Sequence, residues 1–220
     1  MIVLGLDPSL TNFGWAVLDT EAVGAARVVA RGRWQTPSKM EFLARYQQMR
    51  EWLREKIREH KPARMGIEFP VFNDLWSEGM YGLFLFSCEA IKTEKLDVAF
   101  FSPGQIKAHA REFLVARGDR PKGPPKWKMQ KPDMVEAARK ATGGKGRWNH
   151  NEADAYWVAH TAGRFWALFE GQIEPEALTQ PERDQFLKIH TFKRGKRAGK
   201  TVKSGIIHRE SDRFFIWSGA

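Results

Sequence analysis

Cysteine is nearly absent from this chain of 220 residues, which contains Cys88 alone. A single cysteine excludes an intrachain disulfide and the spaced cysteine pairs of a zinc ribbon. The sequence also lacks an apolar run of the roughly 20 residues that a membrane span needs, and its first residues do not have the pattern of a signal peptide. We therefore expect a cytoplasmic protein that folds around a hydrophobic core.

Acidic residues are too few to balance the basic ones. Asp and Glu total 26 whereas Lys and Arg total 36, which gives a formal net charge of +10. A surplus of this size favours a polyanionic partner, either a nucleic acid or an anionic membrane surface. Of these two partners we favour nucleic acid.

Two segments carry much of the basic charge. Residues 117–148 combine Lys and Arg with several Pro and Gly residues, and within them Trp127 lies between Lys126 and Lys128. An aromatic ring between cations suits phosphate contact and base stacking; a solvated loop is the alternative. Residues 188–203 contain seven basic residues and no acidic one, and form either a phosphate-binding arm or a solubilising tail.

The apolar pattern predicts an α/β fold. Apolar runs favour strands at residues 2–7, 13–19, 26–34, 64–69 and 97–101. Apolar residues three and four apart, with capping and breaking residues, favour helices at about residues 38–60, 77–95, from 103, 131–140 and 151–170. Three meandering strands followed by alternating helices and strands predict a mixed five-stranded sheet whose faces are covered by helices.

Helix starts and domain limits follow from shorter signals. Ser38 is the expected N-cap of the first helix, and Ser102, which is followed by a proline, should open the third. We expect one domain over residues 1–170 and a basic C-terminal extension over residues 171–220. The alternation within residues 201–217 predicts a hairpin at the end of this extension.

Three acids stand where apolar structure should continue. Asp7 ends the first strand, Glu68 lies in the fourth, and Asp154 lies near the start of an apolar helix. Buried carboxylates are costly unless they are paired or bound to a metal, and oxygen ligands of this kind suit Mg²⁺ or Mn²⁺. Two such ions can activate a water and stabilise the leaving oxygen in phosphodiester cleavage.

Each acid also has a purely structural explanation. Asp7 could start a turn by capping the amide of Ser9 or Leu10, and Glu68 could lie at the surface of an edge strand. Asp154 could be an acid that the helix dipole favours in the first turn. All three explanations would have to hold together for the metal site to vanish.

The order of the motifs resembles the RuvC-type Holliday junction resolvases, including phage-type members, of the ribonuclease H-like superfamily. The matching segments are GLDPSLTNFGWAVLD from Gly5, IEFPVF from Ile67, SPGQIK from Ser102, KPDMV from Lys131 and ADA around Asp154. They keep the order of the family over roughly residues 1–170.

The resemblance implies a Mg²⁺-dependent, structure-selective endonuclease that cuts four-way DNA junctions. Asp7, Glu68 and Asp154 would be ligands of two Mg²⁺ ions, for which Mn²⁺ can substitute. Lys107 and Lys131 would face the scissile or neighbouring phosphates. The products would carry 5′-phosphate and 3′-hydroxyl ends.

The resemblance further implies a homodimer, since two active sites can make paired symmetric nicks in opposite strands. The helix at residues 77–95 is the expected interface, although it also fits a plain core helix. The family implies a bacterial cell or a phage-infected one as the setting.

One position departs from the family pattern, which usually has an Asp or His three residues before the helix aspartate. Here that residue is Asn151, with His150 before it and Glu152 after it. Offsets of three and four residues lie on the same helix face as Asp154, whereas an offset of two does not. We therefore prefer His150 as fourth ligand or proton shuttle, with Asn151 as a weaker oxygen donor and Glu152 as the least favoured choice.

Other functions also fit parts of the sequence. Ribonuclease H-like cores cut RNA–DNA hybrids and other branched DNA, and fold alone does not decide between substrates. The opening segment also resembles the phosphate loop of sugar kinases and actin-like ATPases, but the chain is too short for their two domains. A non-catalytic junction-binding protein with a decayed site is the remaining alternative.

Overall fold

The computed structural model describes residues 1–20, 26–69, 78–120, 128–144 and 146–187, and beyond them the backbone of four short strands. Lys126, Trp127 and most of the basic stretch 188–203 lie outside the described residues. No helix within the described ranges is long and apolar enough to cross a lipid bilayer.

The elements follow the predicted order. The strands of the described residues are β1 (Ile2–Asp7), β2 (Asn12–Asp19), β3 (Arg27–Gln35), β4 (Arg64–Glu68), β5 (Val98–Phe101), β6 (Ile189–Thr191), β7 (Thr201–Lys203), β8 (Ile207–Ser211) and β9 (Phe214–Trp217). The helices are α1 (Phe42–His60), α2 (Glu78–Thr93), α3 (Pro103–Ala116), α4 (Lys131–Ala141), α5 (His150–Phe169) and α6 (Gln180–Phe186), with a 3₁₀ turn at Pro175–Ala177.

The main sheet has the strand order β3-β2-β1-β4-β5-β9-β8. Strands β1, β2 and β3 form an antiparallel meander, whereas β4 and β5 run parallel to β1. The predicted five-stranded mixed sheet is confirmed, and the antiparallel hairpin β8–β9 extends it by pairing β9 alongside β5. The hairpin predicted at residues 201–217 is thus shorter than expected, because β7 pairs with β6 in a separate sheet.

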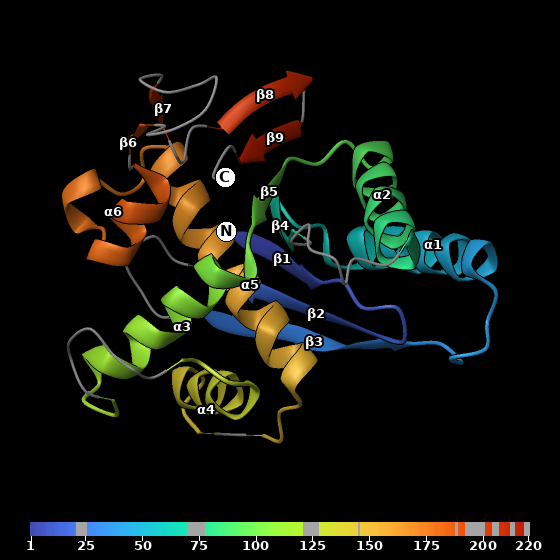
Figure 1. Ribbon diagram of the computed structural model, residues 1–220, viewed down its shortest axis with the longest axis horizontal. Helices are drawn as coiled ribbons and strands as arrows, with labels where there is room; N and C mark the ends of the chain where they lie inside the picture. Colours follow the sequence, from blue (N-terminus) through green and yellow to red (C-terminus); the bar gives the residue numbers. More distant parts are fainter. Residues whose placement is uncertain are drawn as a thin grey trace.

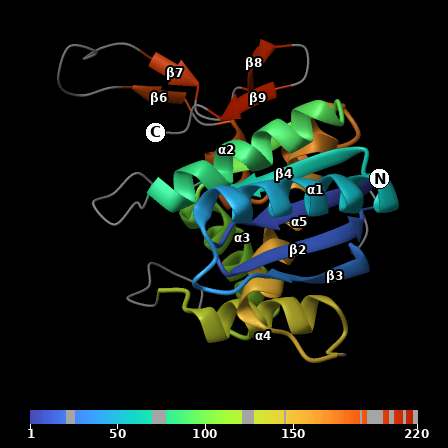
Figure 2. The same cartoon turned by 90° about the vertical axis from the view of Figure 1, so that its right-hand side faces the viewer.

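Helices cover both faces of the sheet (Figure 1; Figure 2). Alternate side chains of a strand point to opposite faces, so that Val3 belongs to the core beneath α5, whereas Leu4 and Leu6 belong to the core beneath α1 and α2. Both cores consist largely of buried apolar side chains. The sheet is therefore buried on both faces, which explains its nearly continuous apolar strands.

Helix α5 lies unusually close to the sheet because the strands beneath it carry glycines. A Cβ atom at Gly5 of β1 would overlap the backbone of Ala155 and Ala159, and one at Gly66 of β4 would lie 2.6 Å from Cβ of Ala162. Small residues on both sides thus set the height of α5 above the sheet. This close approach brings the start of α5 to the ends of β1 and β4.

The two predicted helix caps have different outcomes. Ser102 caps α3 as expected, in a capping box with Gln105. The prediction for Ser38 is wrong, because α1 begins at Phe42 and Glu41 is its N-cap. The buried guanidinium of Arg45 donates hydrogen bonds to the carbonyls of Pro37, Ser38 and Met40, and these contacts hold the segment before Glu41 as a turn.

The chain after α5 folds back onto α3 and α5. Leu178 and Phe186 are buried in the core beneath these helices. Nε of Arg164 lies 2.7 Å from Oε1 of Glu182, which is itself buried. Residues as far as Phe186 therefore share the hydrophobic core of the preceding elements.

Candidate active site

The three predicted acids come from three neighbouring elements. Asp7 is the last residue of β1 and Glu68 is the last residue of β4. These strands are parallel neighbours, with Leu6 opposite Ile67, so that the two acids follow at the next position of each strand. Asp154 lies in the second turn of α5, which packs across β1, β2 and β4. The fold therefore gathers all three acids at one edge of the sheet.

A pocket of about 280 Å³ lies at this edge. The predicted site residues that line it are Asp7, Glu68, Lys107, Lys131, His150, Asn151 and Asp154. Lys107 comes from α3 and Lys131 is the first residue of α4. Two lysines, a histidine and three acids that are distant in sequence therefore share one cavity.

The acids of this pocket make few contacts that could balance their charge. Within the described residues, none of Asp7, Glu68 and Asp154 accepts a side-chain or backbone hydrogen bond or forms an ion pair within 4 Å. Burial, followed by repulsion from Glu68 and Asp154, raises the pKa of Asp7 well above its usual value. The carboxylates are thus held in a state that a cation would stabilise.

Burial raises the pKa values of the other two acids as well. Burial and the charge of Asp154 raise the pKa of Glu68 to about 7, although Lys107 opposes this shift. Burial raises the pKa of Asp154 to about 6, against the opposing charges of Lys107 and Lys131. The two lysines therefore offset only part of the negative charge.

The oxygen donors of the pocket fit a divalent cation in their chemistry. Among the described residues, no three His, Cys, Asp or Glu side chains have the arrangement of a metal cage. Carboxylate oxygens are among the donors that Mg²⁺ and Mn²⁺ prefer.

The residues just before Asp154 have distinct surroundings. Asn151 is buried, lines the pocket, and donates a hydrogen bond of 2.6 Å to the carbonyl of Asn12. Glu152 instead forms an ion pair of 2.6 Å with Arg31 on β3, and it does not line the pocket. Its carboxylate therefore pairs with Arg31 and does not face the pocket.

His150 lies at the mouth of the pocket and is exposed. Partial burial, with the positive charges of Lys131 and Arg33, lowers the pKa of this histidine. Sequence reasoning did not predict that Arg33 lies near this site. Arg33 belongs to the edge strand β3, and the sequence does not indicate which face of the sheet its basic residues occupy. Sequence reasoning also missed the ion pair between Arg31 and Glu152.

Lys128 lies apart from the acids. It is exposed and lines a second pocket, which shares Lys107 with the first. Its predicted neighbours Lys126 and Trp127 fall outside the part of the chain that is described.

Comparisons of the sequence with known proteins identify one family. The family model described as crossover junction endodeoxyribonuclease RuvC matches residues 3–112, which is half of the chain. RuvC of Rickettsia bellii is 40% identical over 68 residues, a match that covers 31% of this chain and 43% of the relative. The match thus spans less than half the length of that curated protein.

Solved structures share the fold. RuvC of T. thermophilus in complex with a Holliday junction substrate has a TM-score of 0.60 at 18% identity, with 78% of this chain and 97% of that chain covered. The yeast mitochondrial Holliday junction resolvase has a TM-score of 0.52 at 11% identity, with 77% and 80% covered. At these identities the likeness establishes a common architecture.

Proposed function

This chain belongs to the RuvC family of crossover junction endodeoxyribonucleases, and on this premise we propose that it is a Mg²⁺-dependent endonuclease that cuts four-way DNA junctions. In this proposal Asp7, Glu68 and Asp154 hold two divalent cations, and Mn²⁺ can replace Mg²⁺. The observation that carries the proposal is a cluster of three half-buried carboxylates in one pocket, none of which has a hydrogen-bond or ion-pair partner among the described residues. The protein would act in the cytoplasm of a bacterial or phage-infected cell.

The residues of the pocket have separate roles in this reaction. When bound, the metal ions supply Lewis-acid activation of the attacking water and stabilisation of the leaving 3′ oxygen. Lys107 and Lys131 bind the oxygens of the scissile and neighbouring phosphates, and they limit the repulsion among the acids. His150, whose lowered pKa favours the neutral form near pH 7, accepts or relays a proton at the mouth of the pocket.

The first experiment incubates the protein with Mg²⁺ and a synthetic four-way junction, beside a duplex of the same arm sequence. We expect paired symmetric nicks in the junction alone, and we expect Asp7→Asn to lose on the order of 10²–10³-fold in rate, as when one charge-stabilising group is removed from an enzyme. Cleavage of RNA–DNA hybrids instead would assign the site to another substrate. Tight junction binding without cleavage in Mg²⁺ or Mn²⁺ would favour a non-catalytic binding protein.

The fourth functional group of the site is testable by a matched pair of variants. His150→Ala should abolish cleavage, because His150 lines the pocket beside Lys131. Glu152→Gln should retain cleavage, because its carboxylate faces Arg31. Rates with saturating junction would separate these outcomes, and the reverse result would reject His150 in favour of Glu152.

We further propose that α2 forms a homodimer interface. Tyr81 and Leu85 are 44% and 45% exposed on this helix, one turn apart, and large apolar side chains on a shared helix face are typical of interfaces. Leu85→Asp should convert a dimer to a monomer in sedimentation experiments. A wild-type protein that sediments as a monomer at micromolar concentration would rule this interface out.

A further inference from the structure

A second pocket adjoins the candidate active site and differs from it in charge. Its volume is about 500 Å³, and α3 and the residues just before α4 form its walls. Lys107 lines both pockets, so the two cavities meet at this side chain. We call the second cavity the α3 groove.

The charged side chains of the α3 groove are all cationic. Lys107 and Arg111 lie four residues apart on α3, so they project from the same face of this helix. Lys128, which precedes α4, also lines the groove, and no carboxylate of the described residues does. The first pocket has three acids that suit cations, whereas the described charged residues of the groove next to it are all positive.

The rest of the lining suits the less polar part of a nucleotide. Met129 is buried at 7% exposure, and Ala108 is half-buried beside it on α3. In a lining of this kind the apolar side chains can contact sugars while the cationic ones bind phosphates. Its volume, greater than that of the first pocket, leaves room for a chain rather than a single ion.

Gly104 lines the groove, and the space around it is open. A Cβ atom at this position would meet only Oγ of Ser102, at 3.8 Å, which is an ordinary contact. Neither packing nor a left-handed backbone therefore requires glycine here. A large side chain would leave the core intact and would project into open space at the groove.

We propose that the α3 groove binds the DNA strand immediately next to the cleaved phosphate, with Arg111 and Lys128 on the adjacent phosphates. The inference rests on the proposed function and deepens it, because Lys107 joins the groove to the pocket where the strand would be cut. A groove of this kind fixes which phosphate reaches the acids. Arg111 is accordingly a substrate-binding residue rather than a catalytic one.

A steric test uses Gly104→Leu with Gly104→Ala as its matched control. Thermal unfolding of both variants should equal or exceed that of wild type, because either residue favours a helix more than glycine does. In EDTA, Gly104→Leu should bind the four-way junction about 5-fold or more weakly, whereas Gly104→Ala should bind within about 2-fold of wild type. Equal binding by all three proteins would overturn the groove.

A charge test uses Arg111→Gln with Arg139→Gln as its control, because Arg139 is exposed on α4 and lines neither pocket. Both variants lose one positive charge, so their difference removes the general effect of net charge. Only Arg111→Gln should lower the slope of log Kd against log salt concentration by about one, as the loss of one phosphate contact does. Equal slopes for the two variants would overturn the proposal.

The two proposals fail in different ways. Junction binding in EDTA requires no cleavage, so weaker binding by Gly104→Leu supports the groove even if wild type leaves the junction intact in Mg²⁺. That outcome would reject the endonuclease alone. Cleavage by wild type together with unchanged binding and cut positions in Gly104→Leu would reject the groove alone. A wild-type protein without affinity for the junction would reject both.

Discussion

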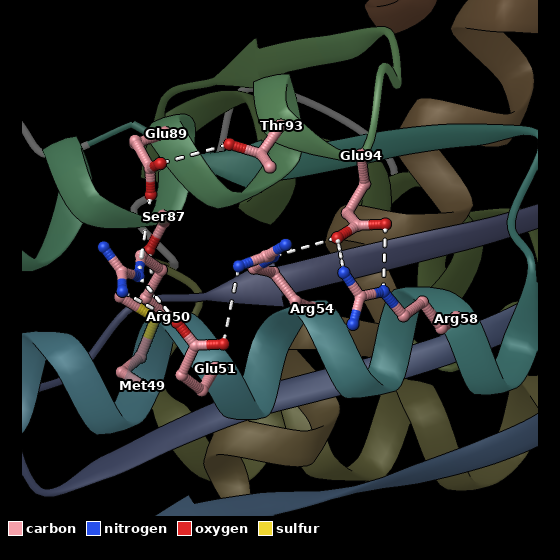
Figure 3. A network of polar contacts seen from close by, with 9 residues as sticks. All are labelled: Met49, Arg50, Glu51, Arg54, Arg58, Ser87, Glu89, Thr93 and Glu94. Atoms are coloured by element: carbon pink, nitrogen blue, oxygen red, sulfur yellow. Dashed lines mark hydrogen bonds and ion pairs between the residues drawn. The ribbon is translucent and has the colours of Figure 1, made fainter.

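Two groups of acidic residues in this protein have opposite surroundings. Between α1 and α2, Glu94 accepts from Arg54 at 2.9 Å and from Arg58 at 2.7 Å, as Figure 3 shows. These hydrogen bonds, that of Arg58 foremost, lower the pKa of Glu94. At the edge of the sheet, Glu68 has no such partner among the described residues, and burial raises its pKa to about 7.

The difference shows where the protein leaves its charge unbalanced. In the α1–α2 contact the acidic charge is balanced by the protein itself, because each acid of this network faces an arginine or a hydroxyl group. The pocket is incomplete, since two lysines offset only part of the charge of three carboxylates. A buried charge without compensation is costly, and a bound cation or protonation of the acids would remove this cost.

Among the changes that test this comparison, Glu68→Gln should have the largest effect, which is on the rate of cleavage. Removal of its charge should lower the rate of junction cleavage on the order of 10²–10³-fold, while the substitution leaves the fold intact. Single-turnover rates at saturating Mg²⁺ would measure the loss. Glu94→Gln is the control, because its carboxylate lies in the α1–α2 network, and its cleavage rate should equal that of wild type.

The next prediction concerns the stability of the metal-free protein against pH. A carboxyl group whose pKa is higher in the folded state than in the unfolded state stabilises the fold when protonated, and this contribution disappears as the pH rises through the folded pKa. The relevant values are a rise from 4.5 to about 7 for Glu68 and from 3.8 to about 6 for Asp154. The free energy of unfolding should therefore fall between about pH 4 and pH 7.

Denaturant unfolding in EDTA would measure this fall, which we expect to be about 1–3 kcal/mol since one pKa unit corresponds to about 1.4 kcal/mol. Millimolar Mg²⁺ at pH 8 should restore much of it by binding the folded state. Glu68→Gln should have a shallower decline and should exceed wild type in stability at pH 8 without metal. A profile that is flat from about pH 4 to pH 7 would show that the pocket charge is already balanced.

The sequence was sufficient to predict features that depend on local signals. Asp7 and Glu68 end apolar strands, and parallel neighbours bring such ends together. Ser102 caps α3 because a proline and Gln105 follow it at the required positions. Ser38 has a similar local signal, but Arg45 binds the carbonyls around it and moves the helix start to Phe42.

Features that depend on contacts between distant elements were beyond sequence reasoning. Helical spacing separated Glu152 from the face of Asp154, but only the fold reveals that Arg31 is its partner. The α3 groove likewise depends on the fold, which brings Lys128 and Arg111 into the lining of one pocket. The pairing of β9 with β5 joins strands more than 100 residues apart, which no local pattern specifies.

The smallest expected effect is the loss of stability in Glu94→Gln. Glu94 joins the end of α2 to two arginines of α1, and its side chain is only 15% exposed, whereas that of Arg58 is 58% exposed. Partly exposed pairs contribute little individually, so the free energy of unfolding should fall by about 1 kcal/mol. Because the lowered pKa of Glu94 gives stability above its unfolded value near 4.5, the difference from wild type should be present at pH 7 and should shrink below pH 4. Glu68→Gln should change stability in the opposite direction under the same metal-free conditions. If both variants lost stability alike at pH 8, the acids of the pocket and those of the α1–α2 network would be equivalent, and the argument for a cation at the pocket would lose its electrostatic basis.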